Sequence, residues 1–150
     1  MEEIERKFKV DHSKWELVEK PIPHRIVQSY LSQNPDCTVR IRIKNDKGFL
    51  TIKGKSIGIS RSEFEYEIPL ADANQMIETL SEKTLYKDRY NIPFGKHLWE
   101  VDVFQGKLEG LIIAEIELSS EDESFEKPEW ILEDVSDNIE YYNSRLIDKC

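Results

Sequence analysis

The sequence contains little cysteine, few histidines and no long hydrophobic run. Cys37 and Cys150 stand far apart without a Cys-x-x-Cys motif, which predicts two free thiols. His12, His24 and His97 lack the spacing of metal ligands and so argue against a zinc site. No apolar segment is long enough to cross a bilayer, and the N-terminus shows no secretory signal. We therefore expect a cytoplasmic protein that does not act at a membrane.

The motifs of several common enzyme classes are also missing. The chain has no Walker A phosphate loop, no Gly-x-Gly-x-x-Gly and no Gly-x-Ser-x-Gly nucleophile elbow. Its 30 acidic and 21 basic residues give a formal net charge of -9, which argues against a nucleic-acid binder held by a general positive field. Any bound phosphate must therefore be held by side chains. The length of 150 residues predicts one domain over residues 1–150.

Polar and apolar residues alternate at period two through most of the chain, which predicts a mainly antiparallel sheet. Eight runs show the pattern: 3–10, 25–31, 38–44, 49–55, 61–68, 85–90, 98–104 and 111–118. Short turn sequences such as Asn45-Asp46-Lys47-Gly48 favour hairpins between neighbouring strands.

Four helix-start signals lie between these runs. Each is a Ser or Asp followed three residues later by Glu or Gln, at Ser13, Asp72, Ser120 and Asp137. Two of the helices would carry an apolar stripe that we interpret as core: Met76, Ile77 and Leu80 in one, and Ile139, Tyr142 and Leu146 in the C-terminal one.

Charged and hydrophobic side chains separate onto opposite faces of the expected strands. In the first strand Glu3, Glu5 and Lys7 share one face, and Ile4 and Phe8 share the other. The same split recurs along the chain, where the charged faces carry Arg40, Arg42, Lys44, Lys53, Lys55, Glu63, Glu65, Glu67, Lys87, Arg89, Glu100, Asp102, Glu115 and Glu117. One face of the whole sheet is therefore ionic.

An ionic face has two interpretations. It can be the wet side of an ordinary antiparallel sheet, which is the better interpretation of any single strand. It can also line the inside of a barrel closed by about eight strands, with helices covering the apolar outside. Here the strands are largely segregated by sign, basic on some and acidic on others, and this grouping favours the inside.

Such a lining would need ligands of both signs. Several carboxylates at close quarters resist joint ionisation unless cations lie between them, and oxygen ligands suit Mg²⁺ or Mn²⁺. Clustered Arg and Lys side chains in turn suit the oxygens of phosphate groups. Both requirements together fit a polyphosphate bound with a divalent metal.

The order of the charged motifs resembles a known family. Glu3-Ile4-Glu5-Arg6-Lys7 has the form Glu-x-Glu-x-Lys, and over nearly the whole chain it is followed by Arg40-Ile41-Arg42, Thr51-Ile52-Lys53, Ser60-Arg61-Ser62-Glu63-Phe64-Glu65, Lys87-Asp88-Arg89-Tyr90, Glu100-Val101-Asp102 and Glu115-Ile116-Glu117. This pattern resembles the CYTH superfamily of triphosphate tunnel metalloenzymes, most of all its short bacterial members, which are similar to inorganic triphosphatases. The resemblance implies an α+β, mainly β fold: an eight-stranded antiparallel barrel, or tunnel, with flanking helices and a C-terminal helix near one mouth.

The resemblance also implies roles for individual residues. The triphosphate would be bound by Lys7, Arg40, Arg42, Lys53, Lys87 and Arg89. Direct or water-mediated contacts to Mg²⁺ or Mn²⁺ would come from Glu3, Glu5, Glu63, Asp102, Glu115 and Glu117. The candidate catalytic residues are Glu5, Glu63 and Lys7. Arg61 and Glu65 share the charged face, and we interpret them as a structural ion pair.

The chain departs from the family pattern in its C-terminal helix. Related short members often carry a lysine beside the asparagine that Asn143 matches, and here Arg145 is the nearby cation that could replace it. The expected reaction is hydrolysis of tripolyphosphate to pyrophosphate and phosphate. The alternatives are class IV adenylyl cyclase, thiamine triphosphatase or nucleoside triphosphatase activity in the same tunnel, or a polyphosphate-binding module without catalysis. A homodimer is possible.

Overall fold

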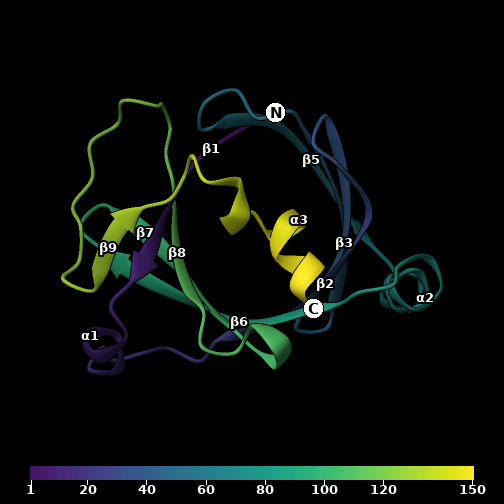
Figure 1. Ribbon diagram of the computed structural model, residues 1–150, viewed down its shortest axis with the longest axis horizontal. Coiled ribbons are helices and arrows are strands. Elements are labelled where there is room, and N and C mark those ends of the chain that lie inside the picture. The colour runs from purple at the N-terminus through teal and green to yellow at the C-terminus, as the bar shows by residue number, and fades with distance from the viewer.

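Nine antiparallel strands form one curved sheet around a central space (Figure 1). The computed structural model describes residues 1–150. The strands are β1 (Glu2–Val10), β2 (His24–Asn34), β3 (Cys37–Lys44), β4 (Lys47–Gly54), β5 (Ser60–Ile68), β6 (Leu85–Phe94), β7 (His97–Phe104), β8 (Ile112–Glu117) and β9 (Ile131–Asp134). Their order in the sheet is β5-β4-β3-β2-β6-β7-β8-β1-β9.

Strand β1 closes the barrel because it pairs with two strands in succession. Its first residues, Glu2 to Ile4, pair with β5, and its later residues, Glu5 to Lys9, pair with β8. Eight strands therefore form a closed antiparallel barrel, and β9 is one extra strand beside the end of β1. The eight-stranded barrel expected from the sequence is confirmed. The expectation missed β9, which has only four residues and so shows too little alternation to be recognised.

The helices are short and lie outside the barrel or at one end of it. They are α1 (His12–Glu16), α2 (Leu70–Leu80) and α3 (Asn143–Leu146), with single 3₁₀ turns η1 (Gly106–Leu108), η2 (Ile139–Tyr141) and η3 (Ile147–Lys149). None of these helices is long and apolar enough to cross a membrane. In Figure 1, α2 lies outside the barrel near β3, whereas α3 lies across the opening that the strands surround.

Two helix starts differ from those expected. Asp11, not Ser13, caps α1, because its carboxylate accepts a hydrogen bond from the Lys14 backbone N–H at 3.1 Å. Helix α2 begins directly after Pro69 instead of at Asp72. Both shifts are small and leave the two helices where the sequence placed them.

The helix expected from Ser120 is wrong, and the C-terminal helix is interrupted. The Glu123 carboxylate accepts a hydrogen bond from the Ser119 backbone N–H, and the Ser120 hydroxyl donates to Asp122, so these side chains stabilise turns that compete with a helix. At the C-terminus, Tyr142 has an extended backbone (φ -71°, ψ 136°), which separates η2 from α3. What the sequence predicts as one helix is therefore three short turns of helix.

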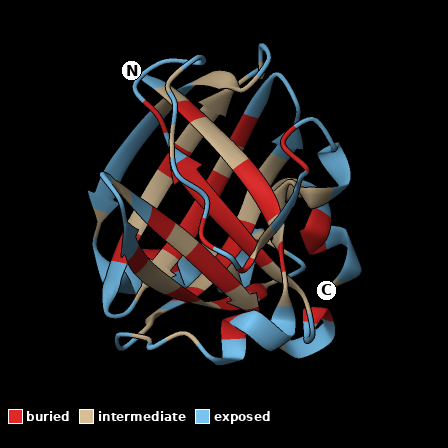
Figure 2. Cartoon of the chain, turned by 90° about the vertical axis from the view of Figure 1, so that its left-hand side faces the viewer, coloured by how far each residue is buried: buried red, intermediate tan, exposed pale blue.

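The larger hydrophobic core lies outside the barrel wall. It packs the outward faces of β1, β7 and β8 against α1 and the segment before β9, and it contains Phe8, Trp15, Trp99, Trp130 and Leu118. The Trp15 and Trp130 ring centroids are 5.3 Å apart. Figure 2 shows this side of the molecule, with buried positions concentrated in the strands and exposed ones in the loops.

A second core fills one end of the barrel itself. Leu85, Phe104 and Ile113 occupy the inward-facing phase of β6, β7 and β8, and they pack against Leu146 and Ile147 of the C-terminal segment. The inward face is thus apolar at this end and ionic along the rest of its length. Leu146 is buried as expected from its stripe.

Four residues of the expected apolar stripes are less buried than predicted. Leu80 is 61% exposed and Ile139 is 50% exposed, while Met76 and Ile77 are half-buried. Helix α2 is anchored instead by Ala73, which is fully buried against β4 at Gly48.

Candidate active site in the barrel lumen

The lumen holds a cavity of about 270 Å³ whose wall is almost entirely polar. Only four of its 24 lining residues are hydrophobic, which suits a charged ligand. Ten of the residues selected from the sequence line it: Glu3, Glu5, Lys7, Arg40, Arg42, Lys53, Glu63, Arg89, Glu115 and Glu117. The other two, Lys87 and Asp102, are fully buried and hydrogen-bonded to each other, and Asp102 also binds Arg89, which lines the cavity. The structure therefore brings the whole selected set together.

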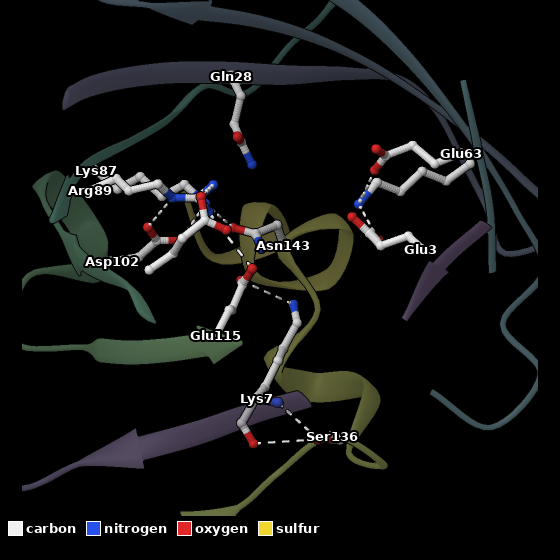
Figure 3. Close-up of polar contacts among 12 residues, drawn as sticks. Glu3, Lys7, Gln28, Glu63, Lys87, Arg89, Asp102, Glu115, Ser136 and Asn143 are labelled. Carbon is white, nitrogen blue, oxygen red and sulfur yellow. Dashed lines mark hydrogen bonds and ion pairs between the residues drawn. The ribbon is translucent and has the colours of Figure 1, made fainter. Parts of the chain in front are cut away.

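Alternation along each strand produces this convergence. Lys7 of β1 lies opposite Glu115 of β8, and Arg89 of β6 lies opposite Asp102 of β7. Because paired residues of antiparallel strands point to the same face, each inward residue places its partner inward as well. Figure 3 shows side chains from separate strands directed toward one space.

Lys53 joins two carboxylates on one side of the lumen. Its ammonium lies 2.9 Å from Glu3 and 3.2 Å from Glu63, and all three side chains are largely buried (Figure 3). Burial raises the pKa of Glu3, although the positive charge of Lys53 opposes this shift. A single cation thus holds two acidic side chains that would otherwise repel each other.

Glu5 is a lumen carboxylate without a cationic partner, as are the more exposed Glu65 and Glu117. It forms no ion pair, whereas Glu3, Glu63 and Glu115 each lie within 4 Å of a Lys or Arg. Burial, together with the negative charges of Glu115 and Glu3, raises the pKa of Glu5 to about 8. This carboxyl group resists ionisation unless a positive charge comes close.

A buried network lies on the opposite side of the lumen. Asp102 accepts two hydrogen bonds from the Arg89 guanidinium, at 2.7 and 2.9 Å, and one from the Lys87 ammonium at 2.7 Å. Lys87 also donates to the side-chain oxygen of Asn143 at 3.0 Å. Burial lowers the pKa of Lys87 to about 7, against the opposing charge of Asp102.

Lys7 and Glu115 form a second charged pair near the C-terminal segment. The Lys7 ammonium lies 3.6 Å from Glu115 and 5.5 Å from the centre of the Tyr142 ring. Its backbone N–H donates to the Ser136 hydroxyl at 2.8 Å. Burial works against both charges, but the charge of Glu115 keeps the pKa of Lys7 raised, and that of Lys7 helps to lower the pKa of Glu115.

Arg40 and Arg42 are different because neither forms an ion pair with a carboxylate within 4.0 Å. Arg40 donates to the Thr51 hydroxyl at 3.1 Å, and Arg42 donates through Nε to the Gln28 side-chain oxygen at 3.0 Å. Burial, with the positive charges of Arg40 and Arg89, lowers the pKa of Arg42 to about 9. This part of the wall carries net positive charge.

Three residues that shape the lumen were missed by sequence reasoning. Gln28 lies on the inward phase of β2, and the alternation of residues 25–31 could have revealed it. Ser136 comes from a segment without periodicity, and the sequence places Tyr142 in an apolar core stripe instead of in the lumen. Ser136 and Tyr142 reach the lumen only because the C-terminal segment folds back over one end of the barrel.

Two sequence interpretations about neighbouring cations are wrong. Arg61 donates to the Gly54 carbonyl and the Thr38 hydroxyl and forms no ion pair with Glu65. Arg145 is exposed and pairs with Glu140 and Asp148 outside the lumen, so it does not replace a tunnel lysine. Asn143, by contrast, does line the cavity.

No three His, Cys, Asp or Glu side chains are arranged as a ready metal cluster. Glu3, Glu63 and Glu115 are instead held by lysine or arginine, whereas Glu5 and its cross-strand neighbour Glu117 form no ion pair. A divalent cation that binds Glu3, Glu63 or Glu115 would therefore have to replace the cationic groups that contact these oxygens.

Comparisons with known proteins find relatives over the full length of the chain. The family model described as the CYTH domain matches residues 1–148. An inorganic triphosphatase of Acetivibrio thermocellus is 47% identical over 146 residues, covering 97% of this chain and 92% of that protein. An inorganic triphosphatase of Nitrosomonas europaea is 34% identical and covers 97% of each chain. The crystal structure of the inorganic triphosphatase NE1496 has a TM-score of 0.68 and 28% identity, covering 97% of this chain and 93% of that one.

Proposed function

The chain belongs to the CYTH family, and on that premise we propose that it hydrolyses inorganic triphosphate to pyrophosphate and phosphate inside the barrel. The observation that carries the proposal is a closed lumen lined by cations and carboxylates together, with very little hydrophobic surface. Such a wall suits a small polyanion bound with a metal cation. It offers no apolar slot of the kind that would hold an adenine or thiamine ring.

We assign the six cations selected from the sequence to the substrate: Lys7, Arg40, Arg42, Lys53, Lys87 and Arg89. The two arginines without carboxylate partners, Arg40 and Arg42, are the strongest candidates for direct phosphate contacts. Guanidinium groups present paired N–H donors that match phosphate oxygens. Lys7 stays protonated because its pKa is raised, so it can donate to the substrate throughout the neutral range.

The donor set fits a divalent cation such as Mg²⁺ or Mn²⁺. Metal-dependent hydrolysis is typical of this family's triphosphatases. In this chain the proposed ligands are Glu3, Glu5, Glu63, Glu115 and Glu117, all of them hard oxygen donors around one cavity. The unpaired, crowded carboxyl of Glu5 supports this assignment, because a nearby positive charge would relieve it. The chemistry that such a cation supplies is charge neutralisation of the phosphates and acidification of the attacking water.

Asp102 has a different proposed role from the one expected. Its two oxygens are already bound by Arg89 and Lys87, and the side chain is fully buried. We propose that Asp102 orients these two cations toward the substrate instead of binding metal directly. Asn143 assists by accepting a hydrogen bond from the same Lys87 ammonium.

The proposed reaction needs no covalent enzyme intermediate. The water oxygen forms a bond to the terminal phosphorus while the bridging P–O bond breaks, and pyrophosphate leaves with the bonding electron pair. Glu5 and Glu63 would help to orient the water, and Lys7 would neutralise charge on the phosphate. Positioning and charge neutralisation supply most of the acceleration in phosphoryl transfer.

The first test is phosphate release from tripolyphosphate, ATP and thiamine triphosphate in parallel, with Mg²⁺, with Mn²⁺ and with chelator. We expect fast release from tripolyphosphate that chelator abolishes, and slower release from the other two. Equal turnover of ATP would favour a nucleoside triphosphatase. No release from any substrate would contradict the proposal and favour cyclase activity or anion binding without hydrolysis.

A pair of variants ties the activity to the lumen. Glu115→Gln keeps the shape of a buried lumen side chain but removes its charge, so we expect turnover to be abolished in a protein that still folds. Glu133→Gln is the matched control, because Glu133 pairs with Lys9 on the outside of the barrel and its side chain is 68% exposed. Unchanged activity in Glu115→Gln would contradict the metal role.

A further inference from the structure

Gln28 is a fully buried polar residue inside the barrel. It lies on β2, opposite Arg42 of β3 on one side and Leu85 of β6 on the other. Figure 3 shows its side chain directed from the barrel wall into the lumen, with the amide nitrogen foremost. Nothing in the sequence motifs or in the charge pattern assigns it a role.

The orientation of the Gln28 amide is fixed by its neighbour. Its oxygen accepts the hydrogen bond from Arg42 Nε at 3.0 Å, and because Nε can only donate, the oxygen must face Arg42. The amide nitrogen is therefore left facing the lumen, where it is buried without any acceptor in the protein. Most buried donors in proteins are paired, so this one requires an explanation.

The surroundings of this nitrogen are positively charged. Arg42 and Arg40 form no ion pair, and Arg40 Nε also lacks an acceptor in the protein. The other lumen cations Lys7, Lys53, Lys87 and Arg89 each contact a carboxylate. Unpaired N–H donors of Gln28 and Arg40 thus lie on the same face of the neighbouring strands β2 and β3, an arrangement that suits a group with several acceptor oxygens.

We propose that Gln28 is a substrate-binding residue, which donates from its amide nitrogen to an oxygen of the phosphate group held by Arg40 and Arg42. Its amide oxygen has a second task, because it fixes the Arg42 guanidinium in position. This inference rests on the proposed function and places a neutral donor beside the two arginines of the wall. The Gln28 amide can donate a hydrogen bond to an oxygen of the anion without adding further positive charge beside the two arginines.

Direct donation can be separated from support of Arg42 by a double-mutant cycle. The variants are Gln28→Met, Arg42→Met and the pair together, since methionine fills a similar volume without donors. If Gln28 acts only through Arg42, its replacement has no further effect once Arg42 is gone. If its nitrogen contacts the anion, the replacement weakens binding in both backgrounds.

The first measurement is the dissociation constant of tripolyphosphate for metal-free protein in chelator, by calorimetry. We expect Gln28→Met to weaken binding roughly tenfold or more in the wild-type and the Arg42→Met backgrounds alike, as expected for a lost hydrogen bond to a charged group. In turnover assays with metal, KM should rise with little change in kcat. Gln75→Met on α2, where the side chain is exposed, is the matched control and should behave as wild type.

The outcomes distinguish this inference from the proposed function. If wild type hydrolyses tripolyphosphate but Gln28→Met has no effect beyond that of Arg42→Met, the inference fails alone. If wild type neither binds nor hydrolyses tripolyphosphate, the proposed function fails with it. Should Gln28→Met not fold, Gln28→Glu replaces it: the carboxylate keeps an acceptor for Arg42 but removes the donor, and wild-type affinity in that variant would overturn the inference.

Discussion

Glu5 and Glu115 lie on adjacent strands of the lumen, and their pKa values move in opposite directions. Burial and neighbouring carboxylates raise the pKa of Glu5 from 4.5 to about 8. Burial also acts on Glu115, but the charges of Lys7 and Arg89 outweigh it and lower the pKa. The folded state therefore favours the protonated form of Glu5 and the ionised form of Glu115.

The two residues should affect stability with opposite signs. A raised pKa makes the unfolded state release its proton first, so Glu5 reduces stability progressively as the pH rises from about 4.5 to about 8. We expect Glu5→Gln to raise the melting temperature of metal-free protein at pH 8 and to change it much less at pH 5. Thermal unfolding in chelator at both pH values measures this effect.

Glu115→Gln is the matched comparison for that experiment. A lowered pKa adds stability above the ordinary value of 4.5, and this stability is lost as the pH falls. The variant should therefore melt below wild type at pH 8, and the difference should shrink at acid pH. Two variants shifting in the same direction at pH 8 would contradict the charge arrangement described for the lumen.

At the level of single residues, the sequence identified every charged side chain of the lumen but not their neutral partners. Strand alternation determines which side chains share a face, so Arg40 and Glu115 could be selected without coordinates. Gln28 was missed because one neutral side chain adds nothing to a charge pattern. Ser136 was missed because its position depends on where a non-periodic segment crosses β1.

Among the elements, α2 depends on one close approach to the barrel. A Cβ atom added at Gly48 of β4 would lie 2.7 Å from the Ala73 Cβ, closer than real Cβ contacts allow. We expect Gly48→Ala to push α2 outward and to lower stability by about 1–3 kcal/mol, as overpacking does. Below the melting temperature, kcat/KM should be unchanged because α2 does not line the lumen.

Gly54→Ala is the control for that substitution. Gly54 also lies on β4, but an added Cβ would find its nearest neighbour, Ser62 Cβ, at an ordinary 3.5 Å. Denaturant unfolding of both variants should show a clear loss only for Gly48→Ala. An equal loss in both would mean that glycine flexibility, not the α2 contact, matters in this strand.

The C-terminal segment carries a second expected difference, between two nearby residues. Asn143 accepts a hydrogen bond from Lys87 inside the lumen, whereas Arg145 is exposed and pairs with Glu140 and Asp148. We expect Asn143→Ala to lower kcat/KM about tenfold, in line with one lost hydrogen bond to a charged group. Arg145→Ala should leave it unchanged, and a marked loss there would restore the idea that Arg145 reaches the tunnel.

The strands were more predictable than the helices, for a physical reason. Strands of this barrel are half ionic and half apolar, so period two is strong over residues 38–44 and 61–68 alike. The helices have only four to eleven residues and few buried positions, so packing of Ala73 or Leu146 decides their extent more than any stripe does. Capping signals alone placed a helix at Ser120 that local hydrogen bonds replace with turns.

At the scale of the whole molecule, cations and carboxylates of the lumen largely pair with one another. The chain has a net charge of -9, yet the lumen cations mostly hold lumen carboxylates. Lys53 is the clearest case, because it contacts Glu3 and Glu63 at once. A metal ion that takes these carboxylates must displace Lys53, and a phosphate group gives the displaced ammonium a new partner.

Metal and anion should therefore bind cooperatively. We expect Mg²⁺ with pyrophosphate to raise the melting temperature by more than the sum of the rises that each produces alone, because each ligand frees side chains for the other. At 100 times its dissociation constant, a ligand adds about 2.7 kcal/mol to stability, which is easily measured by thermal unfolding.

Lys53→Met should bind Mg²⁺ alone more tightly than wild type and lose most of the cooperativity. Lys9→Met, which removes a lysine paired with Glu133 outside the barrel, should retain it. Simply additive shifts in wild type would show that Lys53 does not exchange between carboxylate and phosphate.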